Sequence, residues 1–188
     1  MKRRSDMTVP LTPNPLPQAG EGDEVRFACS TLTSKITRHL ADESATDAFG
    51  AKLAKVLKPG LMITLSGDLG AGKTALVRAM LRALGYSGKV KSPTYALVEF
   101  YVISSLYLYH FDFYRFNDPD EWHEVGFREY FNENSVCLVE WPEKAGGLLP
   151  SPDIKIFLDI RESGRDVTVE ACSEKGRLCL QELDWLQP

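Results

Sequence analysis

Hydrophobic and polar positions repeat with two different periods along this chain, and their order predicts strands and helices in alternation. Apolar or alternating runs of strand length lie at 25–29, 61–65, 96–102, 106–111, 135–139, 154–160 and 167–171. Apolar residues at helical spacing predict helices over 49–57 and 76–84, and a polar stretch predicts another over 119–131. The pattern therefore predicts a three-layer α/β fold with helices on both faces of a mainly parallel sheet. Its last two strands form an antiparallel pair.

Capping and turn residues set the expected ends of the helices. Ser44-Ala45-Thr46-Asp47 has the form of a capping box and predicts the start of the first helix. Pro59-Gly60 predicts the end of that helix, and Gly85 predicts the end of the next one.

Composition bounds the domain organisation and the class of protein. The chain has 188 residues, of which 44% are hydrophobic and 26% charged, with a formal net charge of -4. These values predict one globular domain over 25–188 and disfavour a protein that coats nucleic acid. Residues 1–24 alternate prolines with small and polar residues, and we expect them to form a disordered tail.

The longest apolar runs have only a few residues, so we expect no contact with a membrane. The four cysteines, Cys29, Cys137, Cys172 and Cys179, include no Cys-x-x-Cys pair. This spacing disfavours a zinc site or a disulfide framework and predicts a reducing, cytoplasmic setting.

The segment from Gly67 to Thr74, GDLGAGKT, matches the P-loop pattern G-x-x-x-x-G-K-[ST] and lies between a predicted strand and a predicted helix. Its glycines let backbone N–H groups converge on phosphate oxygens at the positive end of the following helix. Lys73 would reach the β- and γ-phosphates, and the Thr74 hydroxyl would bind Mg²⁺. The segment thus predicts a P-loop NTPase-like fold with a nucleoside triphosphate site. Its expected nucleotide contacts are Gly67, Asp68, Leu69, Gly70, Ala71, Gly72, Lys73, Thr74 and Ala75.

A P-loop needs an acidic partner for the metal at the end of a neighbouring apolar strand, and two carboxylates fit. Glu140 follows the run at 135–139 and has the cleaner Walker-B form, while Asp112 follows 106–111. Asp112 would bind the metal through water or orient the attacking water; alternatively, either residue is a solvated strand-end carboxylate. Thr94, in Ser92-Pro93-Thr94, would sense the γ-phosphate, unless that segment is an ordinary turn. Trp141 lies at a predicted strand end, which favours a packing role, and His110 is a lone histidine, which favours a structural role.

Four motifs occur in this order: GDLGAGKT, SPTY at 92–95, HFDFYR at 110–115 and EWP at 140–142. Over roughly 42–169 the chain resembles the TsaE (YjeE) family of bacterial P-loop ATPases. The resemblance implies a subunit that binds ATP, hydrolyses it slowly by itself, and assists threonylcarbamoyl transfer to adenosine 37 of tRNA. It also implies TsaB and TsaD as protein partners, with tRNA contacted through or near their complex.

The resemblance also implies roles for individual residues. Lys73, Asp112 and Glu140 would be catalytic, and Thr74, Glu140 and Asp112 would hold Mg²⁺. Thr94 would be the nucleotide-sensing switch, and Thr46 and Arg165 would contact the nucleotide.

Two other P-loop classes fit less well. A small-molecule kinase should have an arginine-rich lid, but residues 85–109 contain no arginine. A GTPase should have Asn-Lys-x-Asp to read guanine, and that string is absent. Basic residues are in excess over 35–91, and acidic residues are in excess over 110–145. The basic stretch would contact tRNA and the acidic stretch a basic partner surface; alternatively, both are solvated surfaces.

Overall fold

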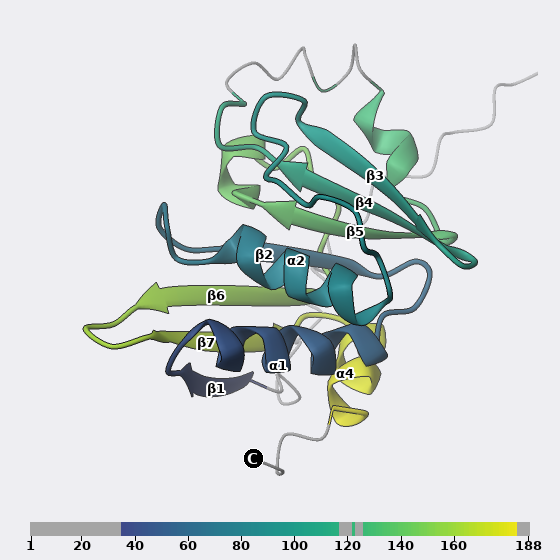
Figure 1. Ribbon diagram of the computed structural model, residues 1–188. Helices are drawn as coiled ribbons and strands as arrows, with labels where there is room; N and C mark the ends of the chain where they lie inside the picture. The colour runs from purple at the N-terminus through teal and green to yellow at the C-terminus, as the bar shows by residue number, and fades with distance from the viewer. Residues whose placement is uncertain (1–34, 117–121, 123–125, 184–188) are drawn as a thin grey trace, which may run out of the picture. The chain divides into compact units, whose positions relative to one another are not determined.

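The computed structural model describes residues 35–116, 122 and 126–183, and Figure 1 shows their arrangement. The expected tail at 1–24 and the expected strand at 25–29 lie outside the described residues, as do residues 119–121 and 123–125 of the expected helix at 119–131. Within the described part, no helix is both long and apolar enough to cross a bilayer.

Seven strands form one mixed sheet in the order β1-β7-β6-β2-β5-β4-β3. Their bounds are β1 Lys35–Leu40, β2 Met62–Ser66, β3 Val98–Ile103, β4 Leu106–Asp112, β5 Ser135–Glu140, β6 Ile154–Ile160 and β7 Arg165–Ala171. The four central strands, β6, β2, β5 and β4, are parallel. The predicted antiparallel pair of late strands is confirmed as β6 with β7. Two further antiparallel pairings, β1 with β7 and β3 with β4, complete the two edges.

Helices α1 (Glu43–Lys55) and α2 (Lys73–Ala83) lie side by side over one face of the sheet (Figure 1). Their buried stripes join the core residues of β2, β5, β6 and β7, and α4 (Glu174–Gln181) adds Cys179 and Leu180 to the same core. The two helices approach closely at Gly50, where an added Cβ would lie 2.5 Å from the Cβ of Ala79.

Helix α1 begins two residues earlier than the capping box predicts. Asp42 is the N-cap, and its Oδ1 accepts a hydrogen bond of 2.8 Å from the backbone N–H of Ala45. Asp is among the strongest N-cap residues, and this start places Thr46 in the first turn, where it is buried.

The opposite face of the sheet is covered by an aromatic cluster around Phe111, Phe113, Trp122 and Phe127. Two short 3₁₀ helices, η1 (Phe127–Tyr130) and η2 (Pro142–Ala145), contribute to this layer. Apolar residues therefore pack on both faces, and the three-layer α/β class is confirmed.

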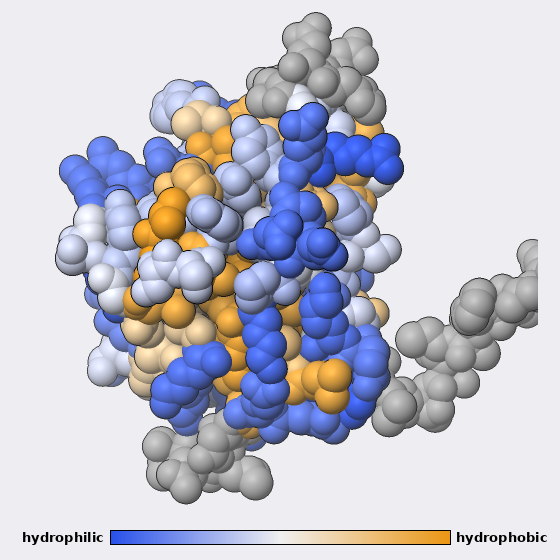
Figure 2. Space-filling view, turned by 90° about the vertical axis from the view of Figure 1, so that its right-hand side faces the viewer, coloured by the Kyte–Doolittle hydropathy of each residue, from blue (hydrophilic) through white to orange (hydrophobic). Residues whose placement is uncertain are grey.

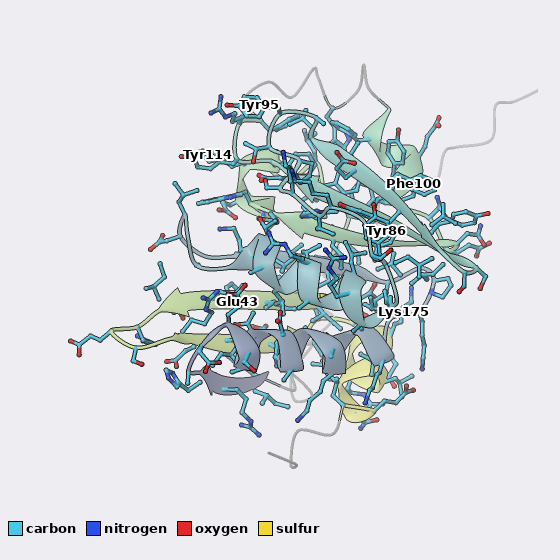
Figure 3. The ribbon with its side chains drawn as sticks, viewed as in Figure 1. Glu43, Tyr86, Tyr95, Phe100, Tyr114 and Lys175 are labelled. Atoms are coloured by element: carbon cyan, nitrogen blue, oxygen red, sulfur yellow. The ribbon has the colours of Figure 1, made fainter. Side chains whose placement is uncertain are left out.

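The edge hairpin β3–β4 exposes several apolar side chains. Phe100, Val102 and Tyr107 are each about half exposed, and the Phe100 ring stacks on those of Tyr107 and Tyr109. Figure 2 shows the side of the molecule on which the turn of this hairpin lies. On that side, hydrophobic residues reach the surface between hydrophilic ones. The turn end of this hairpin, near Phe100, is at the opposite end of β4 from Asp112 (Figure 3).

Candidate nucleotide-binding site

The loop between β2 and α2 has a backbone that only glycine accommodates at two positions. Gly67 has φ 141°, and a Cβ there would lie 2.3 Å from the Leu158 carbonyl oxygen. Gly72, the N-cap of α2, has φ 102°, and a Cβ there would collide with the guanidinium of Arg165. No side chain caps α2, so its first N–H groups remain available for an anion.

Lys73 is the first residue of α2 and is almost fully buried. Its Nζ donates to the carbonyl oxygens of Gly67 at 2.6 Å and Asp68 at 2.9 Å. The same ammonium group lies 3.9 Å from the ring centroid of Trp141. Burial lowers the pKa of Lys73, while the nearby carboxylates of Glu140 and Asp112 oppose that shift.

The two predicted carboxylates end neighbouring parallel strands and are partners in register. Strand alternation turns Asp112 and Glu140 toward the α2 side of the sheet, and each is only 2% exposed. The Thr74 hydroxyl donates to Glu140 Oε1 at 2.8 Å and lies 3.1 Å from Oε2. The P-loop threonine and the Walker-B candidate are thus in direct contact.

The segment Ser92-Pro93-Thr94 is tied to the second carboxylate. The hydroxyls of Ser92 and Thr94 both donate to Asp112 Oδ2, Thr94 at 2.6 Å. The backbone N–H of Tyr114 donates to Oδ1 at 2.9 Å. Thr94 therefore lies beside a carboxylate of the site, whereas its role as a switch stays a prediction.

Sequence reasoning assigned no site role to His110 or Trp141, but both contact site residues. His110 Nε2 lies 2.8 Å from Glu140 Oε1. Trp141 has φ 57°, and this left-handed backbone accompanies the placement of its ring over the ammonium group of Lys73. The ring of Tyr114 packs on Trp141 with centroids 4.9 Å apart. For His110, alternation along β4 was an available signal, because it places His110 and Asp112 on the same face.

These groups surround a pocket of about 280 Å³ at the carboxyl ends of the parallel strands. It is lined by Leu69, Gly70, Gly72, Lys73, Thr74, Ala75, Ser92, Thr94, Asp112, Tyr114, Glu140 and Trp141. Figure 3 shows Tyr95 and Tyr114 at this end of the sheet, while Phe100 and Lys175 lie toward the other end. The crevice beyond the carboxyl ends of the strands is where open α/β sheets bind ligands.

Residues 40–167 match the protein-family model described as "Threonylcarbamoyl adenosine biosynthesis protein TsaE". The chain belongs to the TsaE family. It is 44% identical over 147 residues to the Haemophilus influenzae "tRNA threonylcarbamoyladenosine biosynthesis protein TsaE", covering 76% of this chain and 93% of that protein. The Bacillus subtilis protein of the same name is 37% identical over 141 residues, covering 73% of this chain and 87% of that protein.

Among solved structures, the crystal structure of Bacillus subtilis YdiB superposes on this TsaE family member with a TM-score of 0.71. The two chains are 30% identical, and the match covers 82% of this chain and 97% of YdiB. The predicted family resemblance is thus confirmed, and the P-loop type of fold with it.

Five predicted nucleotide contacts of this TsaE chain do not line the pocket. Gly67 and Asp68 hold Lys73 through their carbonyls, and Ala71 accepts a hydrogen bond of 2.9 Å from Arg165 Nη1. Thr46 is buried in α1, where its hydroxyl donates to the Asp42 carbonyl. Arg165 therefore supports the P-loop from β7, and the nucleotide contacts of Thr46 and Arg165 stay predictions.

The donor set of the TsaE pocket suits a hard divalent cation. Thr74 offers a hydroxyl oxygen, and Glu140 and Asp112 offer carboxylate oxygens. The described residues contain no cluster of three or more His, Cys, Asp or Glu side chains able to hold a metal alone. Mg²⁺ is commonly held by one or two carboxylates together with water and substrate phosphates, so these residues fit it.

Proposed function

We propose that this chain binds and hydrolyses ATP with Mg²⁺ as the ATPase subunit that assists threonylcarbamoyl transfer to adenosine 37 of tRNA. The chain takes part in tRNA threonylcarbamoyladenosine biosynthesis, the process for which its TsaE relatives are named. One observation supports the ATPase assignment most directly. A P-loop lysine and threonine share a single pocket with the two strand-end carboxylates Asp112 and Glu140.

Each group in the pocket has a chemical role in this proposal. The N–H groups of the loop and of the first turn of α2 bind the phosphate oxygens, and Lys73 leaves its carbonyl partners to bind the β- and γ-phosphates. Thr74 and Glu140 would hold Mg²⁺, which neutralises charge on the phosphates when bound. Asp112 orients the water that attacks the γ-phosphate, and Thr94 couples the 92–94 segment to the presence of that phosphate.

The proposal includes TsaB and TsaD as partners, with tRNA contacted through or near their complex. The family resemblance supports the partners, and the basic excess over 35–91 suits a nearby polyanion. We also place the activity in the cytoplasm, because the spacing of the cysteines is that of a protein without a disulfide framework.

The carboxylate assignment is tested with Glu140→Gln and Asp112→Asn, which remove one charge each with little change in shape. We expect ADP affinity in calorimetric titration to stay within about threefold of wild type, whereas ATP hydrolysis falls by about 10²-fold or more. Asp159→Asn, at an exposed position on β6, is the charge-matched control and should hydrolyse ATP normally. If both pocket variants hydrolyse ATP at the wild-type rate, the assignment is wrong.

The partner assignment is tested by pull-down of purified TsaB and TsaD with the full chain, with and without ATP. Recovery of both proteins in an ATP-dependent manner supports the proposal, and failure to recover either one contradicts it. The purified chain alone also tests the alternative of a small-molecule kinase. A kinase would transfer phosphate from ATP to a small-molecule acceptor without TsaB and TsaD.

A further inference from the structure

His110 is a completely buried histidine beside the pocket, on the strand that ends with Asp112. Its Nε2 lies 2.8 Å from Glu140 Oε1, with both side chains shielded from solvent. Its other ring nitrogen, Nδ1, is buried and has no hydrogen-bond partner among the described residues. A buried ring that bonds a site carboxylate through one nitrogen and leaves the other unpartnered calls for an explanation.

The hydrogen-bond pattern fixes the position of the ring proton. A carboxylate accepts hydrogen bonds, so the contact with Glu140 requires the proton on Nε2. The contact therefore makes His110 a hydrogen-bond donor toward Glu140 through Nε2.

Glu140 receives hydrogen bonds from only two of the described side chains, Thr74 and His110, and both reach Oε1. Thr74 is itself expected to bind Mg²⁺, so its hydroxyl is part of the metal site. His110 is then the donor that holds the Glu140 carboxylate from outside that site. A ring on a central strand is a rigid support, because its neighbours in β5 fix it in register.

We propose that His110 is a positioning residue, which orients the carboxylate of Glu140 toward Mg²⁺ by donating from Nε2. The inference rests on the proposed function, since it requires that Glu140 serve the metal. Hydrogen-bond partners of metal-binding side chains typically contribute tenfold to a hundredfold to metal affinity. Removing the donor should therefore weaken Mg²⁺ binding while leaving the contacts of the loop with phosphate in place.

The test measures how ADP affinity depends on Mg²⁺ for the full chain, starting from EDTA. We expect His110→Leu to bind ADP in EDTA within about twofold of wild type, and to need about tenfold more Mg²⁺ for the half-maximal effect. His110→Gln keeps an N–H donor and should recover most of that difference. Leu108→Val trims a buried residue two positions away on the same face of β4, and should leave the Mg²⁺ requirement unchanged.

A second measurement needs no variant. Nitrogen-15 NMR of the wild-type ring, without nucleotide, should show a protonated Nε2. An Nε2 without a proton would overturn the inference even if His110→Leu failed to fold. An unchanged Mg²⁺ requirement in His110→Leu, or a His110→Gln variant as impaired as His110→Leu, would overturn it as well.

These outcomes are distinct from failure of the proposed function itself. If wild-type protein binds no ADP in either EDTA or Mg²⁺, the nucleotide assignment fails and this inference fails with it. If wild type binds ADP and responds to Mg²⁺, but His110→Leu responds equally, only the role of His110 is wrong.

Discussion

Replacing Lys73 with alanine separates the contribution of its side chain from that of the loop backbone. The ammonium group of Lys73 donates to the carbonyls of Gly67 and Asp68 and faces the ring of Trp141. Binding of a phosphate exchanges a contact with a neutral carbonyl for one with an anion. The backbone N–H donors of the loop are unaffected by the substitution, so under the proposed function we expect them to bind the phosphates still.

The size of the effect follows from that exchange. A hydrogen bond to a charged group contributes about 1.5–3 kcal/mol, and about 1.4 kcal/mol corresponds to a tenfold change in affinity. Lys73→Ala should therefore weaken binding of ADP by about 10-fold to 150-fold. Because Lys73 is almost fully buried, water replaces its contacts poorly, and the upper part of that range is favoured.

Isothermal titration of ADP at fixed Mg²⁺ measures the loss. Lys55→Ala removes the same charge from an exposed site in the last turn of α1, so it controls for net charge. Thermal unfolding of both variants establishes that they are folded. A Lys73→Ala affinity within twofold of wild type, with the control also unchanged, would refute the phosphate-binding role of this lysine.

Three further predictions concern the scaffold. Gly50→Ala should lower the free energy of unfolding in urea by about 1–2 kcal/mol, since the added methyl meets α2; equal or greater stability would contradict the close approach. Asp42→Ala should lower the free energy of unfolding by about 1 kcal/mol in the same assay, while Ser44→Ala should leave it almost unchanged. A larger loss for Ser44→Ala than for Asp42→Ala would show that Ser44 is the N-cap, as the capping box predicted. Burial raises the pKa of the Cys137 thiol to about 12. Timed iodoacetamide labelling should therefore modify the exposed Cys172 at least about 100-fold faster than the buried Cys137. Equal labelling rates for the two cysteines would contradict the burial of Cys137.

Local patterns were enough to predict the strand, loop and helix around the P-loop. The apolar run, the glycine loop and the helical stripe are adjacent in sequence, and the structure places β2, the loop and α2 there. Asp112 and Glu140 were predictable because each ends an apolar run, and parallel strands bring their carboxyl ends to one edge.

Contacts set by long-range register were not predictable. The bond from His110 to Glu140 depends on β4 and β5 pairing in one particular alignment. The ring of Trp141 lies over Lys73, and the backbone of Trp141 is left-handed. A left-handed conformation at a residue other than glycine cannot be predicted from the spacing of hydrophobic residues. The start of α1 was missed because Asp42 and Ser44 are both good caps, and burial of the first turn decides between them.

The pairing of β1 with β7 has a consequence for the newly made chain. The hydroxyls of Thr37 and Thr168 lie 2.9 Å apart although 131 positions separate them, and Arg165 on β7 donates to the P-loop carbonyl of Ala71. A ribosome releases the P-loop and α2 well before it releases β7, so a nascent chain that lacks β7 contains the P-loop motif without this contact. The P-loop thus reaches its final set of contacts only after β7 has been made and has paired with β1 at the edge of the sheet.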